Sequence, residues 1–186
     1  CYRVQGCWRS NRTLSAIILR VSSFMTLLVL SLGSNLEPKA NIQLAVTSLR
    51  EKFGELSVSR VFESEAVGFE GNNFLNLVAS GESEASLEDI QNSLKTLEDN
   101  MGRERDKPKF SDRPIDIDIL LFGDSTGEEC GLSLPRAEIL SSAFVLWPLA
   151  ELHPKLKYSP LNLCFDELWD VFDKTQQKLW PIDLSL

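Results

Sequence analysis

Residues 115–119 have the clearest alternation of hydrophobic and polar side chains in the chain, Ile-Asp-Ile-Asp-Ile. Side chains on a β-strand point to opposite faces with a period of two, so the pattern predicts a strand with its three isoleucines in a core. Asp116 and Asp118 then share the other face, about 6–7 Å apart. Two carboxylates this close repel each other and favour a bound cation, and oxygen ligands select a hard cation such as Mg²⁺. Magnesium between paired aspartates is typical of phosphate chemistry.

The other hydrophobic positions predict an order of strand, helix, strand, strand, helix and strand. These elements are expected at about residues 26–32, 38–53, 56–64, 73–80, 86–101 and 115–122. Pro38 suits the first turn of a helix and Gly54 ends it, while Ser86 and Asp89 have the spacing of a capping box. The order matches the ferredoxin-like split βαβ arrangement. We therefore expect an α+β fold with a mostly antiparallel sheet covered by helices.

The C-terminal part of the chain has weaker patterns. The apolar run at residues 144–147 predicts a further short strand. Apolar side chains between residues 164 and 172 recur at helical spacing and predict an amphipathic closing helix.

Length, charge and cysteine content exclude several classes of protein. With 186 residues and 43% hydrophobic composition, the chain is long enough for one domain with a substantial core. Its net charge of −8 argues against nucleic acid as a partner of the whole molecule. The four cysteines have no metal-ligand spacing such as CxxC, which favours a reducing cytoplasm over a disulfide framework.

Residues 1–24 differ in composition from the rest of the chain. They contain four arginines and no acidic residue, so that residues 25–186 carry a net charge of −12. Such a leader resembles an organelle transit peptide. We favour the alternative that Met25 is the natural start, that residues 1–24 are extraneous, and that residues 25–186 form a single domain. A membrane span is not expected, because Arg20 and two serines interrupt the long apolar stretch.

The segment that precedes the aspartates is rich in cations. Five basic side chains lie within eleven residues of this otherwise acidic protein, at Arg103, Arg105, Lys107, Lys109 and Arg113. A solvated loop with salt bridges is the ordinary interpretation of such a run. Its position beside paired carboxylates instead favours a clamp for a polyphosphate, because arginine binds phosphate bidentately and lysine binds it as a point charge.

A possible site for a flat heterocycle lies on the strand at residues 73–80. Phe74 and Asn76 share a face of this strand, where an aromatic ring would stand beside an amide that can pair with a heterocycle edge. The alternative, with Phe74 in the core and Asn76 bound to the backbone, is about equally favoured. His153 is the only histidine, and we assign it no role.

No phosphate-binding glycine motif occurs in the chain, neither GxxxxGK[ST] nor GxGxxG. Any ATP phosphates would therefore be held by metal and basic side chains. Gly33-Ser34 after a strand also occurs in nucleotidyltransferases, but there the Asp-x-Asp pair follows closely. The gap of about eighty residues argues against that family.

Seven segments together resemble the 6-hydroxymethyl-7,8-dihydropterin pyrophosphokinase family. They occur in the family's order at residues 32–36, 63–68, 73–78, 97–105, 113–120, 134–136 and 144–149. The Gly-Arg-x-Arg followed by Arg-x-x-Asp-x-Asp-Ile is highly specific in this context. The resemblance covers nearly everything from Met25 to about residue 155.

The resemblance implies a ferredoxin-like α/β/α sandwich, expected as a monomer, that transfers pyrophosphate from ATP to the pterin hydroxymethyl group and releases AMP in folate biosynthesis. It implies that Asp116 and Asp118 hold two Mg²⁺ ions, and that Arg103 and Arg113 neutralise the transferring phosphates. Further ATP-binding positions are Glu98, Arg105, Phe110, Ile119, Ser133 and Arg136. The pterin-binding positions are Ser64, Val67, Phe74, Asn76 and Phe144, with the two phenylalanines sandwiching the ring.

Four positions depart from the family pattern. Glu65-Ala66 stands where the family usually has Pro-Pro, Arg136 replaces a histidine, Ser142 replaces an arginine, and Phe110 replaces a loop tryptophan. These changes affect the ATP contacts more than the metal and pterin positions. Arg136 is a candidate to compensate for Ser142.

Two other functions remain open from the sequence. A non-catalytic pterin- or nucleotide-sensing module would bind both ligands without forming AMP. A nucleotidyltransferase that used the same aspartates would release pyrophosphate instead.

Overall fold

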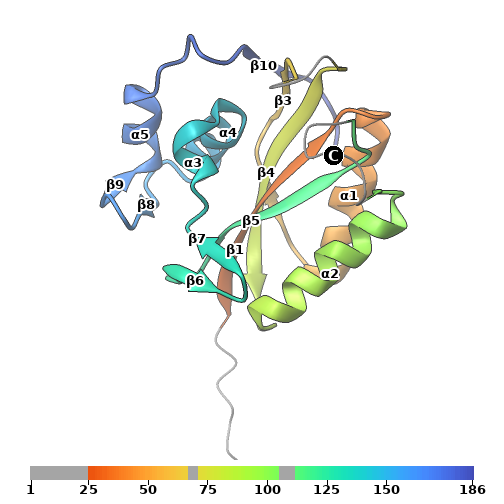
Figure 1. Cartoon of the computed structure of the whole chain (residues 1–186), viewed down its shortest axis with the longest axis horizontal. Coiled ribbons are helices and arrows are strands. Elements are labelled where there is room, and N and C mark those ends of the chain that lie inside the picture. Colours follow the sequence, from red (N-terminus) through yellow and green to blue (C-terminus); the bar gives the residue numbers. More distant parts are fainter. Residues whose placement is uncertain (1–24, 67–70, 105–111) are drawn as a thin grey trace, which may run out of the picture.

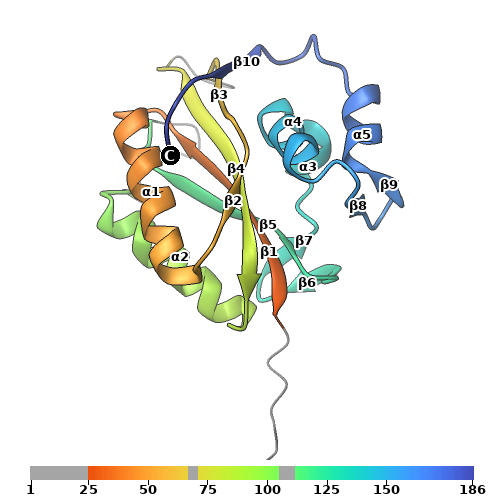
Figure 2. The same ribbon diagram turned by 180° about the vertical axis from the view of Figure 1, so that it is seen from behind.

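An antiparallel sheet between two layers of helices forms the body of the protein (Figures 1 and 2). The computed structural model describes residues 25–66, 71–104 and 112–186. These residues contain ten strands, β1 (Thr26–Ser34), β2 (Ser57–Val58), β3 (Val61–Ser64), β4 (Phe74–Ser83), β5 (Asp116–Phe122), β6 (Gly127–Glu129), β7 (Leu132–Leu134), β8 (Lys157–Tyr158), β9 (Leu163–Cys164) and β10 (Leu179–Ile182). The five helices in the described residues are α1 (Pro38–Phe53), α2 (Leu87–Asn100), α3 (Glu138–Ser141), α4 (Ala143–Leu152) and α5 (Phe165–Val171).

The main sheet has the order β10-β3-β4-β1-β5, and β2 also pairs with β4. Each of these pairings is antiparallel. Helices α1 and α2 cover one face, and α3, α4 and α5 cover the other (Figure 2). The predicted α+β, ferredoxin-like arrangement is confirmed. The strands before and after α1, β1 and β3, are separated in the sheet by β4, and those before and after α2, β4 and β5, are separated by β1.

Two hydrophobic cores lie on either side of the sheet. In β1, Leu28, Leu30 and Leu32 face α1 and α2, whereas Val29 faces α4. In β5 the alternation is interrupted where the register with β1 shifts, so that Leu120 and Leu121 both pack on the α4 side. The aspartates precede this irregularity and keep the strict alternation.

The helix boundaries on the first face agree with the predictions. Pro38 is the first residue of α1, and Gly54 ends it with a φ of 79° while its N–H donates to the carbonyl of Arg50. The Ser86 hydroxyl accepts a hydrogen bond from the Asp89 N–H at 3.1 Å and caps α2. Local capping chemistry therefore defines both helices.

The predicted strand at residues 56–64 is divided into β2 and β3. Ser57 lies opposite Ser80 in β4, but Phe62 lies opposite Asn76, so one extra residue is inserted between the two pairings. The Ser59 hydroxyl accepts a hydrogen bond from the Val78 N–H at 3.0 Å in this interval. The insertion is a bulge, and a hydrophobic pattern alone does not locate it.

The predicted strand at residues 144–147 is wrong, because these residues belong to α4. Helix α4 is buried between the sheet and α5, so most of its sides are apolar and the run has no helical periodicity. A four-residue apolar run cannot distinguish a buried strand from a buried helix. The predicted closing helix is confirmed as α5, but the chain then returns to the sheet and adds β10 beside β3, which the sequence analysis missed.

No helix among the described residues is both long enough and apolar enough to span a membrane.

Candidate active site

Asp116 and Asp118 lie on the face of β5 that is turned away from α1 and α2. The side chains of Ile115, Ile117 and Ile119 are buried in the opposite core, as predicted. Across the ladder, Asp116 is paired with Gly33 and Asp118 with Ser31 in β1. Small neighbours on β1 leave both carboxylates accessible, with 26% of the Asp116 side chain and 48% of the Asp118 side chain exposed.

Asp116 is held between two arginines. The Arg103 guanidinium donates to one carboxylate oxygen and the Arg113 guanidinium to the other. Arg103 also forms an ion pair with Glu98. Burial alone would lower the pKa of Arg103, but the carboxylates of Asp116 and Glu98 raise it above its ordinary value. Two cations are thus fixed beside Asp116 before any ligand is bound.

Glu98 is the buried support of this cluster. It lies on α2, is 4% exposed, and accepts the Ile117 N–H at 2.8 Å as well as the Arg103 guanidinium. Ile117 lies between the two aspartates, so the carboxylate of Glu98 ties α2 to the middle of the Asp-x-Asp segment. The structure gives Glu98 this supporting position, and the direct contact with ATP that the resemblance implies stays a prediction.

Asp118 has a different environment. Arg136, which follows β7, donates to the Asp118 carboxylate at 3.3 Å and to Glu138 at 3.0 Å. Burial and, second, the negative charge of Asp116 raise the pKa of Asp118, although Arg136 opposes the shift. Since 48% of the side chain is exposed, water moderates this effect. The Nε atom of Arg136 is buried without a hydrogen-bond partner in the described part of the chain.

A network centred on Asn35 was not predicted by the sequence analysis. Asn35 follows β1, is 2% exposed, and donates to the Asp112 carboxylate at 2.6 Å and the Asn72 carbonyl at 3.3 Å. Its side-chain oxygen accepts the Arg113 N–H at 2.7 Å. Asn35 therefore fixes the start of the aspartate segment. The signals in the sequence were a polar residue directly after a buried strand and its place in residues 32–36, one of the segments that resemble the family.

The expected ring-binding residues converge at the same end of β1 as the aspartates, on its other edge, because Gly33 pairs with Asp116 in β5 and with Asn76 in β4. Asn76 is buried and donates to the Ser64 hydroxyl at 3.0 Å, and Ser64 lies opposite Phe74 in the ladder. A Cβ atom built at Gly33 would lie 3.2 Å from the Asn76 side-chain oxygen and 3.9 Å from the Phe74 ring. The absence of a side chain at Gly33 thus gives both residues room on the site face.

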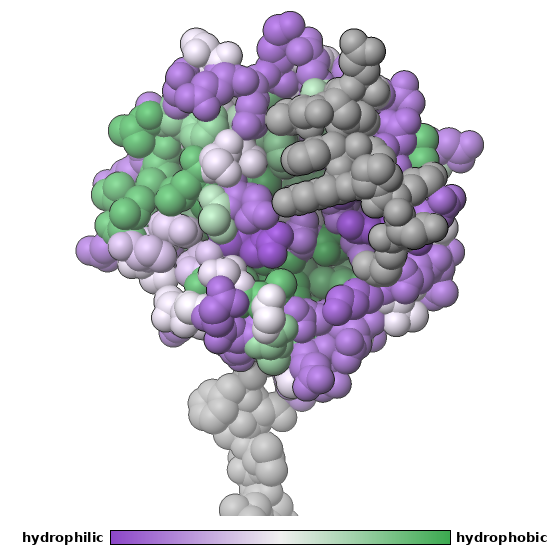
Figure 3. All heavy atoms as spheres, in the orientation of Figure 1, coloured by the Kyte–Doolittle hydropathy of each residue, from purple (hydrophilic) through white to green (hydrophobic). Residues whose placement is uncertain are grey.

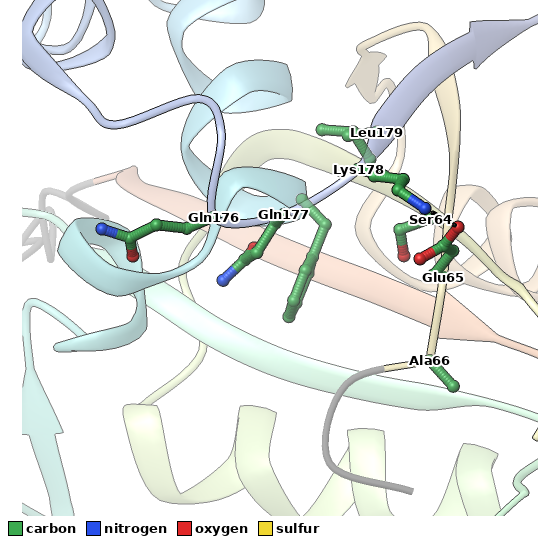
Figure 4. Close-up of a pocket in the computed structure, with 8 residues that line it drawn as sticks. Ser64, Glu65, Ala66, Gln176, Gln177, Lys178 and Leu179 are labelled. Carbon is green, nitrogen blue, oxygen red and sulfur yellow. Dashed lines mark hydrogen bonds and ion pairs between the residues drawn. The ribbon is translucent and has the colours of Figure 1, made fainter. Parts of the chain in front are cut away.

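A cavity of about 260 Å³ adjoins Ser64 (Figure 4). It lies between the end of β3 and the start of α4, from which Phe144 projects. Its lining consists of Ser64, Glu65, Ala66, Phe144, Gln176, Gln177, Lys178 and Leu179. Phe144 and Ser64 were predicted site residues. The residues from 176 to 179 were not, because they lie far away in the sequence and have no chemical motif.

The remaining predicted positions are less informative. Ile119 has its side chain in the core, so that any contact with ATP would involve its backbone. Ser133 is exposed in the β6–β7 hairpin. Val67, Arg105 and Phe110 lie outside the described residues. Hydrophilic side chains gather near the middle of the face seen in Figure 3, with more hydrophobic areas to the left of them and below.

The two aspartates supply only part of the ligands that a metal ion needs. Within residues 25–66, 71–104 and 112–186, no three His, Cys, Asp or Glu side chains form a metal-binding group. Mg²⁺ commonly uses one or two protein carboxylates and takes its other ligands from water and substrate phosphates. Asp116 and Asp118 fit a magnesium ion that is bound together with a nucleotide, and do not form an all-protein cage.

Comparisons with known proteins identify the family. Residues 29–154 match the family model described as 7,8-dihydro-6-hydroxymethylpterin-pyrophosphokinase. The 2-amino-4-hydroxy-6-hydroxymethyldihydropteridine pyrophosphokinase of Aquifex aeolicus is 33% identical over 71% of this chain and 83% of its own length. The protein of the same name from Pseudomonas aeruginosa is 36% identical over 68% of this chain and 80% of its own length.

This chain belongs to the 7,8-dihydro-6-hydroxymethylpterin-pyrophosphokinase family. Membership confirms the predicted resemblance and an enzyme of the pyrophosphokinase class, and it does not favour the non-catalytic sensing module. The folate synthesis bifunctional protein of Arabidopsis thaliana is also similar, at 33% identity over 67% of this chain and 26% of its own length.

Solved structures support the fold of the pyrophosphokinase domain. A Plasmodium falciparum HPPK-DHPS crystal structure with pteroate superposes with a TM-score of 0.61 at 17% identity. The match covers 83% of this chain and 44% of that one. Another Plasmodium falciparum HPPK-DHPS structure gives a TM-score of 0.64 at 14% identity. This chain spans less than half the length of those proteins, and the likeness concerns the fold alone.

Proposed function

We propose that this chain transfers the pyrophosphoryl group of ATP to the hydroxymethyl oxygen of 6-hydroxymethyl-7,8-dihydropterin in folate biosynthesis. The observation that carries the proposal is the pair Asp116 and Asp118, set among three arginines and next to an aromatic slot. In this reaction the pterin oxygen forms a bond to the β-phosphorus of ATP. The bond from that phosphorus to the bridging oxygen of the α-phosphate breaks, AMP leaves with that oxygen, and the hydroxyl proton passes to water.

On the ATP side, the proposed roles follow from charge. Arg103 and Arg113 flank Asp116 and can turn to phosphate oxygens, because guanidinium groups bind phosphate bidentately. Two Mg²⁺ ions would be held by Asp116 and Asp118, and when bound they neutralise charge on the phosphates. The remaining proposed ATP-binding residues are Glu98, Arg105, Phe110, Ile119, Ser133 and Arg136.

Arg136 is the residue of this set with the strongest structural support. It forms an ion pair with Asp118, and its Nε atom has no hydrogen-bond partner among the described residues. A buried N–H without a partner costs free energy, so a phosphate oxygen that accepts from it would relieve that cost. This supports the proposal that Arg136 takes over the phosphate contact of the arginine that Ser142 replaces.

On the pterin side, Phe74 and Phe144 are proposed to stack on the ring, with Ser64, Val67 and Asn76 along its edge. Within the described residues the Asn76 side-chain oxygen accepts no hydrogen bond, and it lies where a side chain at position 33 would approach it if that residue were not glycine. An amide in this position can accept from a pterin amino or ring N–H. Buried hydrogen-bonding groups of this kind provide specificity for a heterocycle.

This enzyme is further proposed to be a monomer, which is the expectation for its family, and to act in a reducing cytoplasm. The free thiols of Cys130 and Cys164, the two cysteines in the described residues, support only the second of these points.

The test is an AMP assay with ATP, Mg²⁺ and 6-hydroxymethyl-7,8-dihydropterin. We expect Asp116→Ala and Asp118→Ala to abolish AMP formation, and chelation of magnesium to do the same in the unaltered protein. Asp124→Ala is the matched control, because Asp124 is an exposed acid just after β5 and should leave turnover unchanged. Near-normal turnover in either aspartate variant would show that the metal assignment is wrong. Release of pyrophosphate in place of AMP would indicate a nucleotidyltransferase.

A further inference from the structure

The segment after α5 crosses back over the molecule and closes one side of the cavity beside Phe144 (Figure 4). We call residues 173–182 the C-terminal strap. It ends in β10, which pairs with β3 through Leu179 and Ser64 among others. The strap lies outside residues 29–154, which match the family model. Any role in the site would therefore belong to a part of the chain that the family motifs do not cover.

Gln177 ties the strap to the junction between α3 and α4. Its side-chain oxygen accepts the Ala143 N–H at 2.7 Å, and its side-chain nitrogen donates to the Ser141 carbonyl at 3.0 Å. Ala143 is the first residue of α4, and Ser142 at the N-cap position provides no side-chain cap. The Gln177 amide supplies that cap from a distant part of the sequence, since the first N–H groups of a helix have no partner within it.

The other wall of the cavity is tied to the strap by charged and polar side chains. Lys178 forms an ion pair with Glu65 at 2.8 Å, and the Trp180 indole N–H donates to Glu63 at 3.2 Å. Glu65 is one of the two residues that replace the usual Pro-Pro of the family, and the ion pair gives this departure a structural partner. The strap therefore contacts two of the elements that carry proposed ring-binding residues, β3 with Ser64 and α4 with Phe144.

The hydrogen bonds of Gln177 and the contacts of Lys178 and Trp180 differ in how much they stabilise the position of the strap. The Lys178 side chain is 74% exposed and that of Glu65 is 53% exposed, and ion pairs as exposed as this contribute little. Gln177 instead binds two backbone groups, those of Ser141 and Ala143, which lie three residues and one residue before Phe144. Its hydrogen bonds set where α4 begins and, with it, where the Phe144 ring stands relative to Ser64.

We propose that Gln177 is a positioning residue for the pterin. It holds the start of α4 so that Phe144 faces the end of β3 across the cavity that Phe144 and Ser64 both line. The strap is then the outer wall of the pterin site. This inference rests on the proposed pterin site, because it assumes that Phe144 stacks on the ring.

The test compares the Michaelis constants of the full chain for the two substrates. Gln177→Ala removes both hydrogen bonds, and we expect the KM for the pterin to rise about tenfold, as the loss of about one hydrogen bond's free energy predicts. The KM for ATP should stay within about twofold, since the arginine cluster is untouched. Gln177→Glu keeps the acceptor for the Ala143 N–H and should give an intermediate pterin KM.

Gln43→Ala is the matched control. The Gln43 side chain on α1 donates to the distant Ser185 carbonyl at 2.8 Å, and Gln43 is not among the residues that line the cavity. An equal rise of the pterin KM in Gln43→Ala, an equal rise of the ATP KM in Gln177→Ala, or no change in Gln177→Ala would each overturn the inference. Thermal unfolding of every variant shows whether the chain is folded. If Gln177→Ala does not fold, the pterin KM of Gln177→Glu decides whether Gln177 positions Phe144.

Phe144→Ala separates this inference from the proposed function. If Phe144→Ala raises the pterin KM and Gln177→Ala does not, the pterin site stands and the positioning role is wrong. If neither variant changes the pterin KM while AMP is still formed, the pterin binds elsewhere and the proposed site is wrong as well.

Discussion

Replacement of Glu98 should both destabilise the protein and loosen the ATP side of the active site. The Glu98 carboxylate is 4% exposed and joins the Arg103 guanidinium to the N–H of Ile117, between the two aspartates. In Glu98→Ala, the Ile117 N–H loses its acceptor inside the protein, and Arg103 keeps Asp116 as a partner. The variant therefore removes the link between α2 and the Asp-x-Asp segment without removing either aspartate.

The size of the effect follows from these contacts. A buried N–H left without an acceptor costs about 1–3 kcal/mol, and a hydrogen bond to a charged group contributes about 1.5–3 kcal/mol. The Arg103 side chain is 21% exposed and retains Asp116, so the second contribution falls at the lower end of that range. We expect a loss of about 3 kcal/mol in the free energy of unfolding, which corresponds to a fall in Tm of about 6–12 °C for a domain of this size. Glu98→Gln keeps an acceptor oxygen and should lose about 1 kcal/mol.

Urea denaturation and thermal unfolding measure the stability, and steady-state kinetics measures the KM for ATP. We expect that KM to rise in both Glu98 variants, because Arg103 loses its ion pair with the Glu98 carboxylate in each of them and is less firmly oriented. Glu88→Gln is the control, since Glu88 is exposed in the first turn of the same helix and should change stability by a few tenths of a kcal/mol, about the value of a helix-dipole interaction. A Glu98→Ala protein within about 1 kcal/mol of the unaltered chain would refute the reasoning from burial.

Three further predictions concern the rest of the molecule. Gly33→Ala places a Cβ atom 3.2 Å from the Asn76 side-chain oxygen, so the KM for the pterin should rise by about three- to tenfold with little change in Tm; an unchanged KM would exclude crowding of Asn76. Gly81→Ala places a Cβ atom 2.5 Å from the Leu56 side chain and should cost about 1–3 kcal/mol in urea denaturation, and an equally stable variant would contradict this overpacking. Burial lowers the pKa of His153, so the unfolded chain binds a proton that the folded chain excludes, and stability should fall as the pH drops from about 7 to about 5. The stability of His153→Gln should depend less on pH over that range. A pH dependence identical to that of the unaltered chain would mean that other groups cause it.

The sequence predicted those elements and site residues that depend on interactions between neighbours along the chain. The alternation of residues 115–119 identified the buried isoleucines and the paired aspartates, because a strand's side-chain period needs no tertiary information. Pro38 and Gly54 identified the bounds of α1 for the same reason. The run at residues 144–147 was misassigned because α4 is buried on most sides, and a helix without a polar face has no period to detect.

The sequence by itself determined the fold class, the family and the chemical character of the site, since these depend on short motifs whose residues act through local geometry. Only the tertiary structure decided which groups support those motifs. Asn35, Glu98 and Gln177 are polar residues whose partners lie on other elements. The partner is almost eighty residues away for Asn35, about twenty for Glu98 and more than thirty for Gln177. Hydrogen bonds to distant backbone groups leave no periodic pattern in a sequence, because they are set by how the helices and strands pack and not by the spacing of residues along one of them.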